Sequence, residues 1–495
     1  MTDVTGMTDP DAHGTRPAPP GPPAPAARPA DYLTAVAALQ RAYAAIPPGS
    51  PVRLAKRTSN LFRFRDAGPA TRSRSRSGGT AAAPPPGQLD VSAFDRVLCI
   101  DPGSRTALVG GMTTYEHLAD ATLRYGLMPL VVPQLKTITL GGAVTGLGIE
   151  SSSLRSGMPH ESVTEIEILT GDGRVVRASD TNEHAALYRG FPNSYGTLGY
   201  ALALTIELEP VSPFVHLRHF RFDTPEACMD AVAQIARHGS LGGHRADFVD
   251  GTAFSLDEMY LTVGAFSEVA PWRSDYTRGR IYYQSLRGPR EDFLTISDYL
   301  WRWDTDWFWC SRPFGVQRPL VRALWPRRYR RSDVYRKLVA LDRRHGFTRA
   351  LDQRRGRPAT EMVVQDVEIP VERSAEFLQY FLTDVGMNPV WLCPLRLRGE
   401  TTWPLYPMKP GQVYVNFGFW GTVALPPGEH DGYFNRRVED KVTELGGHKG
   451  LYSTAFYPRE EFWARYNGPE YARLKRAYDG QGRLADLYDK CVRGV

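Results

Sequence analysis

A run of glycines and small hydroxyl residues is the stretch of this chain best suited to chemistry. Residues 139–157 read TLGGAVTGLGIESSSLRSG and contain five glycines, at positions 141, 142, 146, 148 and 157. Such a stretch has little side chain to bury, and it offers backbone N–H groups, hydroxyls and backbone freedom instead. A loop needs these groups if it must lie flat against a phosphate or a planar ring. A glycine-rich surface turn is the alternative interpretation.

Three more loops of small or polar residues occur in the same part of the chain. They are residues 56–60 (KRTSN), 133–139 (PQLKTIT) and 195–199 (YGTLG). We expect the four loops together to line a long, flat, anionic ligand, because amides and hydroxyls bind phosphates and glycines admit a ring. The alternative interpretation of residues 56–60 is an ordinary hairpin turn.

The segments around these loops must position them, and their patterns are β-rich. Alternating residues predict strands at 97–101, 163–169 and 201–208, with the GDG of 171–173 as a hairpin turn. Beyond Pro210 the order of expected elements is that of an α+β unit with an antiparallel sheet. The expected helices there are 224–238, 372–382 and 436–445, and the expected strands are 260–266, 363–370, 389–397 and 414–419.

Composition and motifs exclude several classes of protein. The 495 residues carry a formal charge of +6, and the basic runs at 72–76 and 312–344 lack a nucleic-acid recognition signature beside them. Five cysteines without a C-x-x-C and eleven scattered histidines indicate neither a metal site nor a disulfide framework. No signal peptide or membrane span is evident, so we expect a reduced cytoplasm. Rossmann, P-loop, H-E-x-x-H and G-x-S-x-G motifs are absent.

The glycine run and its neighbours resemble a known flavoprotein domain. Residues 133–157, the GDG hairpin and NSYGTLG at 193–199 resemble the FAD-binding domain of the vanillyl-alcohol-oxidase/PCMH superfamily. The chain is more closely similar to the delta-24-sterol reductase (Diminuto) branch, whose glycine run likewise reads GG…GxGIExSS before a GTLG loop. Further segments similar to that branch are 247–251 (DFVDG), 389–394 (PVWLCP) and 462–468 (FWARYNG).

The resemblance implies an α+β fold with two main domains. A two-part PCMH-type FAD-binding domain is expected at 31–209, with a flexible, low-complexity insertion at 66–88. An α/β cap, or substrate, domain with an antiparallel sheet is expected at 210–450, and residues 451–495 are expected to return to the FAD domain. Residues 1–30 are rich in proline, alanine and glycine and are expected to be disordered.

The resemblance also implies a set of cofactor-binding residues. The expected contacts to FAD are Arg53, Lys56, Thr58, Ser59, Pro133, Thr139, Gly141, Gly142, Ala143, Gly146, Gly148, Ile149, Glu150, Ser151, Ser152, Ser153, Gly157, Gly196, Thr197 and Gly199. Some members of the superfamily hold FAD covalently through a histidine in the first loop or a cysteine after the glycine run. Neither residue is present here, so we expect FAD to be bound noncovalently. The N-terminal membrane segment of the sterol reductases is also missing, so any membrane contact is expected to be peripheral.

Candidate catalytic residues are fewer. The L-K-x-x-Y-D segment at 474–479 implies that Lys475 lies near the flavin ring, where a cation stabilises charge on the reduced ring; an exposed helical lysine is the alternative. Reduction of an unactivated alkene needs a proton donor, and Tyr466, Tyr195, His160 and Glu150 are the candidates. For Tyr466 the alternative is a packing aromatic.

An aromatic and arginine-rich block at 301–331 is the remaining feature. Its aromatic residues are Trp301, Trp303, Trp307, Phe308 and Trp309, and its arginines include Arg312, Arg318, Arg322, Arg327, Arg328, Arg330 and Arg331. One interpretation is a lipid-facing surface that makes peripheral contact with a membrane and binds phosphates. The other is a buried aromatic core with a solvated basic rim.

We therefore expect an FAD-dependent oxidoreductase that reduces a carbon–carbon double bond of a lipid with NADPH as electron donor. The lipid would be a sterol, a terpenoid, or a methylene-bearing or unsaturated acyl chain. An FAD-dependent oxidase or dehydrogenase of an alcohol or sugar is the alternative enzyme. A flavin-less interaction protein with the same fold is a third hypothesis, and the intact glycine run speaks against it.

Overall fold

The structure is a computed structural model of the whole chain, and it describes residues 27–56, 62–63, 87–345, 356 and 358–494. Several sequence expectations fall outside these described residues. They are Thr58 and Ser59 of the first loop, residues 1–26 of the tail expected at 1–30, and residues 66–86 of the insertion expected at 66–88. Ala30, within the expected tail, instead begins the first helix.

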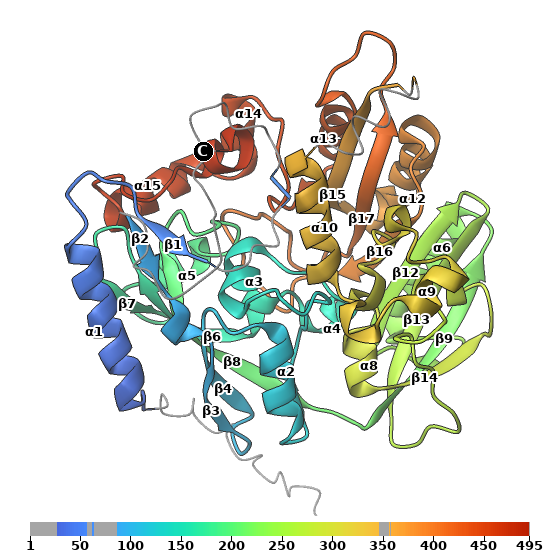
Figure 1. Ribbon diagram of the computed structural model, residues 1–495, viewed down its shortest axis with the longest axis horizontal. Helices are drawn as coiled ribbons and strands as arrows, with labels where there is room; N and C mark the ends of the chain where they lie inside the picture. The colour runs from blue at the N-terminus through green and yellow to red at the C-terminus, as the bar shows by residue number, and fades with distance from the viewer. Residues whose placement is uncertain (1–26, 57–61, 64–86, 346–355, 357, 495) are drawn as a thin grey trace, which may run out of the picture.

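The first structural unit is built on a six-stranded sheet (Figure 1). Its strand order is β3-β4-β8-β6-β7, and β5 pairs with β8 at one end. The strands are β3 (Val97–Asp101), β4 (Thr106–Gly110), β5 (Leu127–Pro129), β6 (Val163–Leu169), β7 (Val175–Ala178) and β8 (Tyr200–Pro210). The helices are α1 (Ala30–Ala44), α2 (Tyr115–Leu123), α3 (Leu140–Gly146), α4 (Ser153–Ser156) and α5 (Ala185–Gly190), with short 3₁₀ turns at Ser92–Phe94 and Pro159–Ser162.

A separate pair of short strands lies beside this sheet. β1 (Arg53–Ala55) pairs in parallel with β2 (Gln88–Asp90). Phe62, on the far side of the first loop, instead forms a parallel bridge with Ser453. The described residues that flank the first loop therefore do not pair with one another as the strands of a hairpin would.

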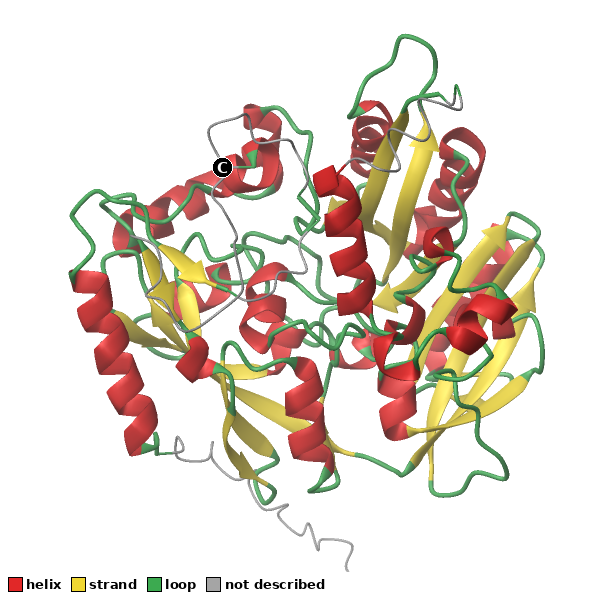
Figure 2. Ribbon diagram, viewed as in Figure 1, coloured by secondary structure: helices red, strands yellow, loops and turns green. Residues whose placement is uncertain are grey.

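The second unit is an eight-stranded antiparallel sheet in the order β14-β9-β13-β12-β16-β17-β15-β18. Figure 2 shows this sheet apart from the first one, with helices and loops between them. Its strands are β9 (Phe214–Phe222), β12 (Phe248–Ser255), β13 (Glu258–Ser267), β14 (Glu291–Thr295), β15 (Thr360–Pro370), β16 (Val390–Leu395), β17 (Tyr414–Ala424) and β18 (His448–Lys449). A small hairpin pairs β10 (Ser240–Leu241) with β11 (His244–Arg245). The combination of helices and antiparallel sheets confirms the predicted α+β class.

Two groups of helices cover the second sheet, one on each face (Figure 1). Behind it lie α6 (Pro225–His238), α12 (Val371–Tyr380) and α13 (Tyr433–Glu444), which share one hydrophobic core with the inward side chains of the strands. In front lie α8 (Ile296–Leu300), α9 (Pro319–Leu324) and α10 (Ser332–His345). The remaining helical segments are α7 (Tyr282–Ser285), α14 (Arg459–Arg465), α15 (Gly468–Tyr478) and the short turns Asp304–Asp306, Arg312–Phe314, Arg327–Tyr329, Phe381–Val385 and Asp489–Arg493.

The C-terminal segment packs on the first unit as well as on the second, where Tyr466 contacts Lys449 of β18. The ammonium group of Lys475, on α15, donates a hydrogen bond to the carbonyl of Thr197, at 2.7 Å. Lys490, near the end of the chain, donates to the carbonyl of Tyr195, at 2.6 Å. The loop at 195–199 is thus held by residues almost three hundred positions away in the sequence.

The glycine run is not the open loop that its composition suggests, because α3 and α4 form within it. Thr139 caps α3, since its hydroxyl accepts a hydrogen bond from the Gly142 N–H at 3.2 Å. The Thr145 hydroxyl donates back to the Gly141 carbonyl at 2.7 Å. Leu140, Ala143 and Val144 are buried in the core, and this packing outweighs the poor helix propensity of glycine.

Candidate active site

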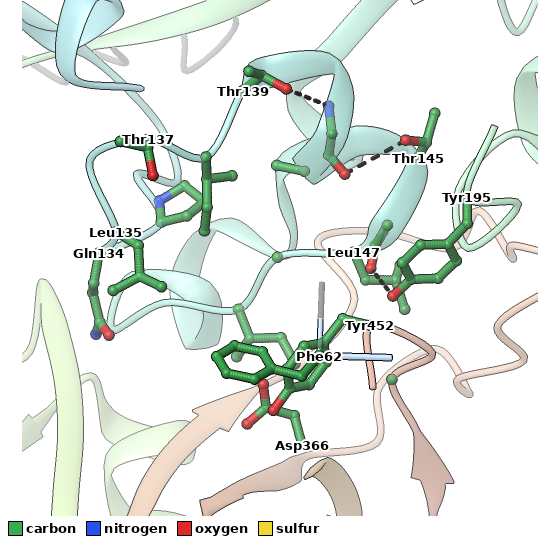
Figure 3. A pocket seen from close by; sticks show the side chains of 18 of the residues that line it. Phe62, Gln134, Leu135, Thr137, Thr139, Thr145, Leu147, Tyr195, Asp366 and Tyr452 are labelled. Atoms are coloured by element: carbon green, nitrogen blue, oxygen red, sulfur yellow. Dashed lines mark hydrogen bonds between the residues drawn. The ribbon is translucent and has the colours of Figure 1, made fainter. Parts of the chain in front are cut away.

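A large cavity lies where the glycine run faces the second sheet and the C-terminal segment. Its volume is about 230 Å³, and it is open to solvent on one side. In Figure 3, Thr139 and Thr145 lie on one side of it, while Phe62, Tyr452 and Asp366 lie together on the other. The residues that line it are Lys56, Phe62, Met112, Pro133, Gln134, Leu135, Thr137, Ile138, Thr139, Gly142, Ala143, Thr145, Gly146, Leu147, Gly148, Ile149, Tyr195, Trp307, Phe308, Asp366, Glu368, Trp391, Trp420, Gly450, Tyr452 and Lys490.

One wall of the cavity is formed by backbone and small side chains of α3 and its flanking turns. A Cβ atom on Gly142 would lie 2.8 Å from Thr139 Oγ1, and one on Gly146 would lie 3.0 Å from the Tyr195 ring. The Tyr195 hydroxyl also donates to the Gly146 carbonyl. Neither glycine has room behind it for a larger residue, so a side chain there would project into the cavity or displace its wall.

The expected cofactor residues divide between this cavity and its surroundings. Lys56, Pro133, Thr139, Gly142, Ala143, Gly146, Gly148 and Ile149 line it. Expected residues that lie outside the lining are Arg53, Gly141, Glu150, Ser151, Ser152, Ser153, Gly157, Gly196, Thr197 and Gly199. Among these, Ser151 shares a hydrogen bond with the Tyr299 hydroxyl at 2.8 Å, and Ser152 donates to the Leu130 carbonyl. Ser151 therefore joins the two units, whereas Ser152 forms its hydrogen bond within the first unit.

Three cations gather at one end of the cavity, around Tyr195. The Arg63 guanidinium carbon lies 4.4 Å from the centre of the Tyr195 ring, and Lys490 donates to the Tyr195 carbonyl. Burial, followed by the nearby charges of Arg63 and Lys56, lowers the pKa of Lys490 to about 7. Burial also lowers the pKa of Lys56. An anion bound among these cations would relieve their mutual repulsion and restore the charged form of Lys490.

The opposite wall is aromatic and belongs to the second unit. Phe308 stacks on Trp420, with ring centres 4.3 Å apart, and Phe62 stacks on Trp307 at 5.5 Å. Trp307 and Phe308 both have positive φ, at 48° and 57°. Two consecutive bulky residues in the left-handed region cost energy, and such strain is concentrated at functional sites.

Two buried carboxylic acids also face the cavity, and sequence reasoning did not single them out. Asp366 and Glu368 alternate along β15 with Val367, which enters the core behind the sheet. Tyr452 lies beside Asp366, and its hydroxyl accepts a hydrogen bond from the Trp420 indole N–H at 2.9 Å. The Asn416 side-chain amide donates a hydrogen bond to Asp366 Oδ1 at 3.4 Å. Burial raises the pKa of Asp366 to about 7. The sequence does place two carboxylic acids at alternate positions of a predicted strand, so that both lie on one face of it. The same pattern is typical of a strand face that is exposed to solvent.

The carboxyl group of Asp366 is accommodated by a glycine on the next strand. Gly418 of β17 pairs with Asp366, and a Cβ atom there would lie 2.6 Å from Asp366 Oδ1. Glu368 receives a hydrogen bond from the Tyr406 hydroxyl, and burial and the neighbouring Asp366 raise its pKa well above the usual range. The two acids form a coupled pair that is neutral or singly charged near neutral pH.

The catalytic candidates from the sequence lie away from the cavity, with the exception of Tyr195. Tyr466 is 2% exposed and donates to the Lys449 carbonyl at 2.9 Å, in an aromatic cluster with Phe462. Lys475 donates to three backbone carbonyls and pairs with Asp479 at 2.7 Å. It holds α15 in place and, unlike Lys490, does not line the cavity.

Glu150 and His160 are both enclosed by protein. Glu150 accepts hydrogen bonds from the Gln134 amide at 2.9 Å and from the Ser151 N–H, and Arg302 lies 3.7 Å from it. Burial raises the pKa of Glu150 to about 7. His160 packs against Trp403, and burial lowers its pKa to about 3, so the ring is neutral.

The aromatic block does not form the surface that one interpretation proposed. Trp301, Trp303, Trp307, Phe308 and Trp309 are all buried, with exposed fractions of 7% or less. Arg322 and Arg330 are buried with them. This part of the block is a core and a cavity wall, because the tryptophans pack against the second sheet and one another.

The groups that surround the cavity fit FAD. The Arg63 Nη1 atom is buried without a hydrogen-bond partner in the part of the chain that the structure describes. FAD carries a pyrophosphate, which matches the three cations, and a flat ring system, which matches a glycine wall opposed by an aromatic one. Among the described residues that line the cavity there is no cysteine or histidine that could form a covalent link. Within the described ranges, no group of acids, histidines and cysteines has the geometry of a metal site, and no helix has the length and apolarity to cross a bilayer.

Comparisons with known proteins agree with this site. Residues 71–179 match the model of a family described as FAD binding domain. Two relatives are named Delta(24)-sterol reductase. The one from Rattus norvegicus is 29% identical to this chain, in an alignment that covers 74% of this chain and 70% of that protein. The one from Homo sapiens is 27% identical, in an alignment that covers 81% of this chain and 76% of that protein. A relative from Mycolicibacterium smegmatis, named decaprenylphosphoryl-beta-D-ribose oxidase, is 30% identical over 80% of this chain and 83% of its own length.

Proposed function

The chain belongs to the PCMH-type family of FAD-binding flavoprotein oxidoreductases, and we propose that it reduces a carbon–carbon double bond of a lipid. Its class as an FAD-dependent oxidoreductase follows from the family and from the sterol reductase relatives. The type of substrate and the direction of the reaction are the proposal.

One observation carries the proposal: an aromatic wall faces the glycine wall across the cavity. Trp307, Phe308, Trp391 and Trp420 supply that wall, and their apolar surface suits a hydrocarbon better than a sugar. The names of the relatives support this choice. The rat and human proteins are named for a sterol, and the Mycolicibacterium protein is named for a sugar joined to a decaprenyl phosphate.

The residues of this chain supply binding and proton transfer. Bound FAD supplies the hydride chemistry. Pro133, Thr139 and the glycines of α3 would hold it through backbone groups, while Lys56, Arg63 and Lys490 would neutralise its phosphates or the electron-rich edge of its ring.

The proton for the second alkene carbon would come from the Asp366 and Tyr452 pair. Tyr452 and Asp366 both line the cavity and lie beside one another, so a proton given up by the phenol can be replaced from the carboxyl group. The Trp420 N–H stabilises the phenol oxygen as negative charge develops on it. The aromatic wall excludes water, which strengthens each of these interactions.

The proposal is tested by reducing the enzyme-bound flavin without oxygen and then offering oxidants. We expect NADPH to bleach the flavin absorbance, and an alkene-bearing lipid, but no sugar, to restore it with formation of the saturated product. Purified protein without a flavin spectrum would contradict every enzyme hypothesis. Failure of all alkene lipids, together with rapid reoxidation by oxygen, would contradict the reductase.

An FAD-dependent oxidase or dehydrogenase of an alcohol is the second candidate. The relative named decaprenylphosphoryl-beta-D-ribose oxidase favours it, because that protein is 30% identical over most of its length. Asp366, ionised, would then act as the base that accepts the hydroxyl proton through Tyr452. Release of hydrogen peroxide during turnover of an alcohol would select this candidate.

A further inference from the structure

Large hydrophobic side chains that reach solvent are concentrated in one stretch of the second unit. Among the described residues, nine such side chains are largely exposed, and seven of them lie between positions 269 and 341. The most exposed are Leu320 and Leu324, at 82% and 85%. They stand four residues apart on α9, so they form one apolar ridge on a single helix face. Isolated exposed leucines are ordinary, but a pair at the tip of a cluster is a sign of an interaction site.

The opposite face of α9 is firmly anchored. Arg322 is 1% exposed and forms an ion pair with Asp306 at 2.7 Å. Its guanidinium also donates to the carbonyls of Tyr276 and Arg280, each at 2.9 Å. Because α9 is fixed from below, its two leucines cannot turn inward without breaking this buried ion pair.

The ridge is surrounded by positive charge without compensation. Arg318, Arg327 and Arg328 are exposed, and no carboxylate of the described residues lies within ion-pair distance of them. The sequence from 307 to 332 contains seven arginines and no acidic residue. Figure 1 shows α9 in front of the second sheet. The surface therefore combines an aliphatic ridge with exposed arginines that flank it in sequence.

We propose that residues 318–329 form a docking tip for an anionic lipid bilayer. Leu320 and Leu324 insert below the headgroups, and Arg318, Arg327 and Arg328 bind the lipid phosphates. This pairing of aliphatic insertion and basic flanks is the chemistry of interfacial membrane contact. A nucleic acid would bind the cations but would leave the aliphatic ridge without a partner. An acidic protein would also bind the cations, but it has no hydrocarbon layer into which the leucines could insert.

The docking tip is connected to the cavity through a short piece of chain. Asp306, the partner of Arg322, is followed directly by Trp307 and Phe308, which line the cavity. A bilayer bound at the tip would therefore contact a helix that is tied, through Arg322 and Asp306, to the segment that builds the aromatic wall. The proposal does not depend on which reaction the enzyme catalyses.

The test is sedimentation of the full-length, FAD-loaded protein with vesicles. We expect binding to equimolar phosphatidylglycerol and phosphatidylcholine at least about tenfold stronger than to phosphatidylcholine alone, and weakened by salt. L320E/L324E should lose at least about tenfold in affinity, and R318Q/R327Q/R328Q should bind both kinds of vesicle equally weakly.

The matched control is L33E/Y125E, which places two charges on exposed apolar positions of the first unit. It should sediment as the wild type does. Unchanged vesicle binding of L320E/L324E would overturn the proposal, as would equal loss in the control. A dimer in solution that L320E/L324E dissolves, with no vesicle binding by the wild type, would assign the ridge to a second copy of the chain instead.

Discussion

Trp420 donates its indole N–H to the hydroxyl oxygen of Tyr452, at 2.9 Å, and so joins β17 to the segment that follows β18. Tyr452 in turn lies beside Asp366 of β15. The phenol of Tyr452 is thereby held at the cavity with a donor on one side and an acid on the other. This arrangement leads to a first pair of predictions about proton transfer.

The pH dependence of turnover should reveal the direction of the reaction. Reduction needs Asp366 protonated, and its pKa is about 7, so the rate should be constant at low pH and fall as pH rises through 7. Oxidation needs the carboxylate, so the rate should rise through the same range. D366N should remove this inflection and lower the rate by about 10²–10⁴-fold while the flavin spectrum is retained. An unchanged pH profile in D366N would assign the titration to another group.

Replacement of two buried tyrosines should have opposite consequences. Y452F removes a phenol that faces the cavity, and we expect turnover to fall by about 10²-fold or more with normal flavin content. Y466F removes a hydrogen bond to the Lys449 carbonyl, which costs about 1 kcal/mol of stability and leaves turnover close to that of the wild type. Turnover of both variants, measured at the same flavin content, shows which tyrosine donates the proton. Slow turnover of Y466F together with normal turnover of Y452F would identify Tyr466 as the donor.

Two lysines near the C-terminus form a second matched pair. K490M removes a buried cation beside Arg63 and Lys56, and should weaken FAD binding by about 10–100-fold. K475M leaves three carbonyls and Asp479 without their cation, and should mainly lower the midpoint of thermal unfolding. Fluorescence titration of apoprotein with FAD gives the affinity for each. A larger loss of affinity in K475M would place that lysine, rather than Lys490, at the cofactor.

The glycine wall predicts a steric effect on cofactor binding. G142V should abolish FAD binding, because a Cβ atom at Gly142 already lies 2.8 Å from Thr139 Oγ1 and the remaining atoms must enter the cavity. A Cβ atom at Gly399 would meet no other atom within 4 Å, so G399V serves as a control that should keep its flavin. The absorbance of purified protein near the flavin maximum is the measurement. Retention of flavin by G142V would contradict the placement of the cofactor beside α3.

Composition and spacing alone indicated a long, flat, anionic ligand, and the resemblance of the glycine run to a known flavoprotein domain identified that ligand as FAD. Backbone amides and missing side chains, as in the glycines of α3, can be recognised from composition and spacing. The same local character made the α+β class predictable from alternating and helical patterns. Even so, α3 itself was expected to be a loop, since the burial of Leu140 and Val144 that stabilises it is not a local property.

Only the tertiary structure decided which side chains face the cavity. Asp366, Tyr452 and Trp420 come from separate strands and loops, and they meet only once the second sheet and the C-terminal segment come together. The sequence singled out Lys475 and not Lys490, and the tryptophans of 301–309 suited a surface as well as a core. Contacts between residues distant in sequence decided both cases, and such contacts also set the pKa values on which the proposed chemistry rests.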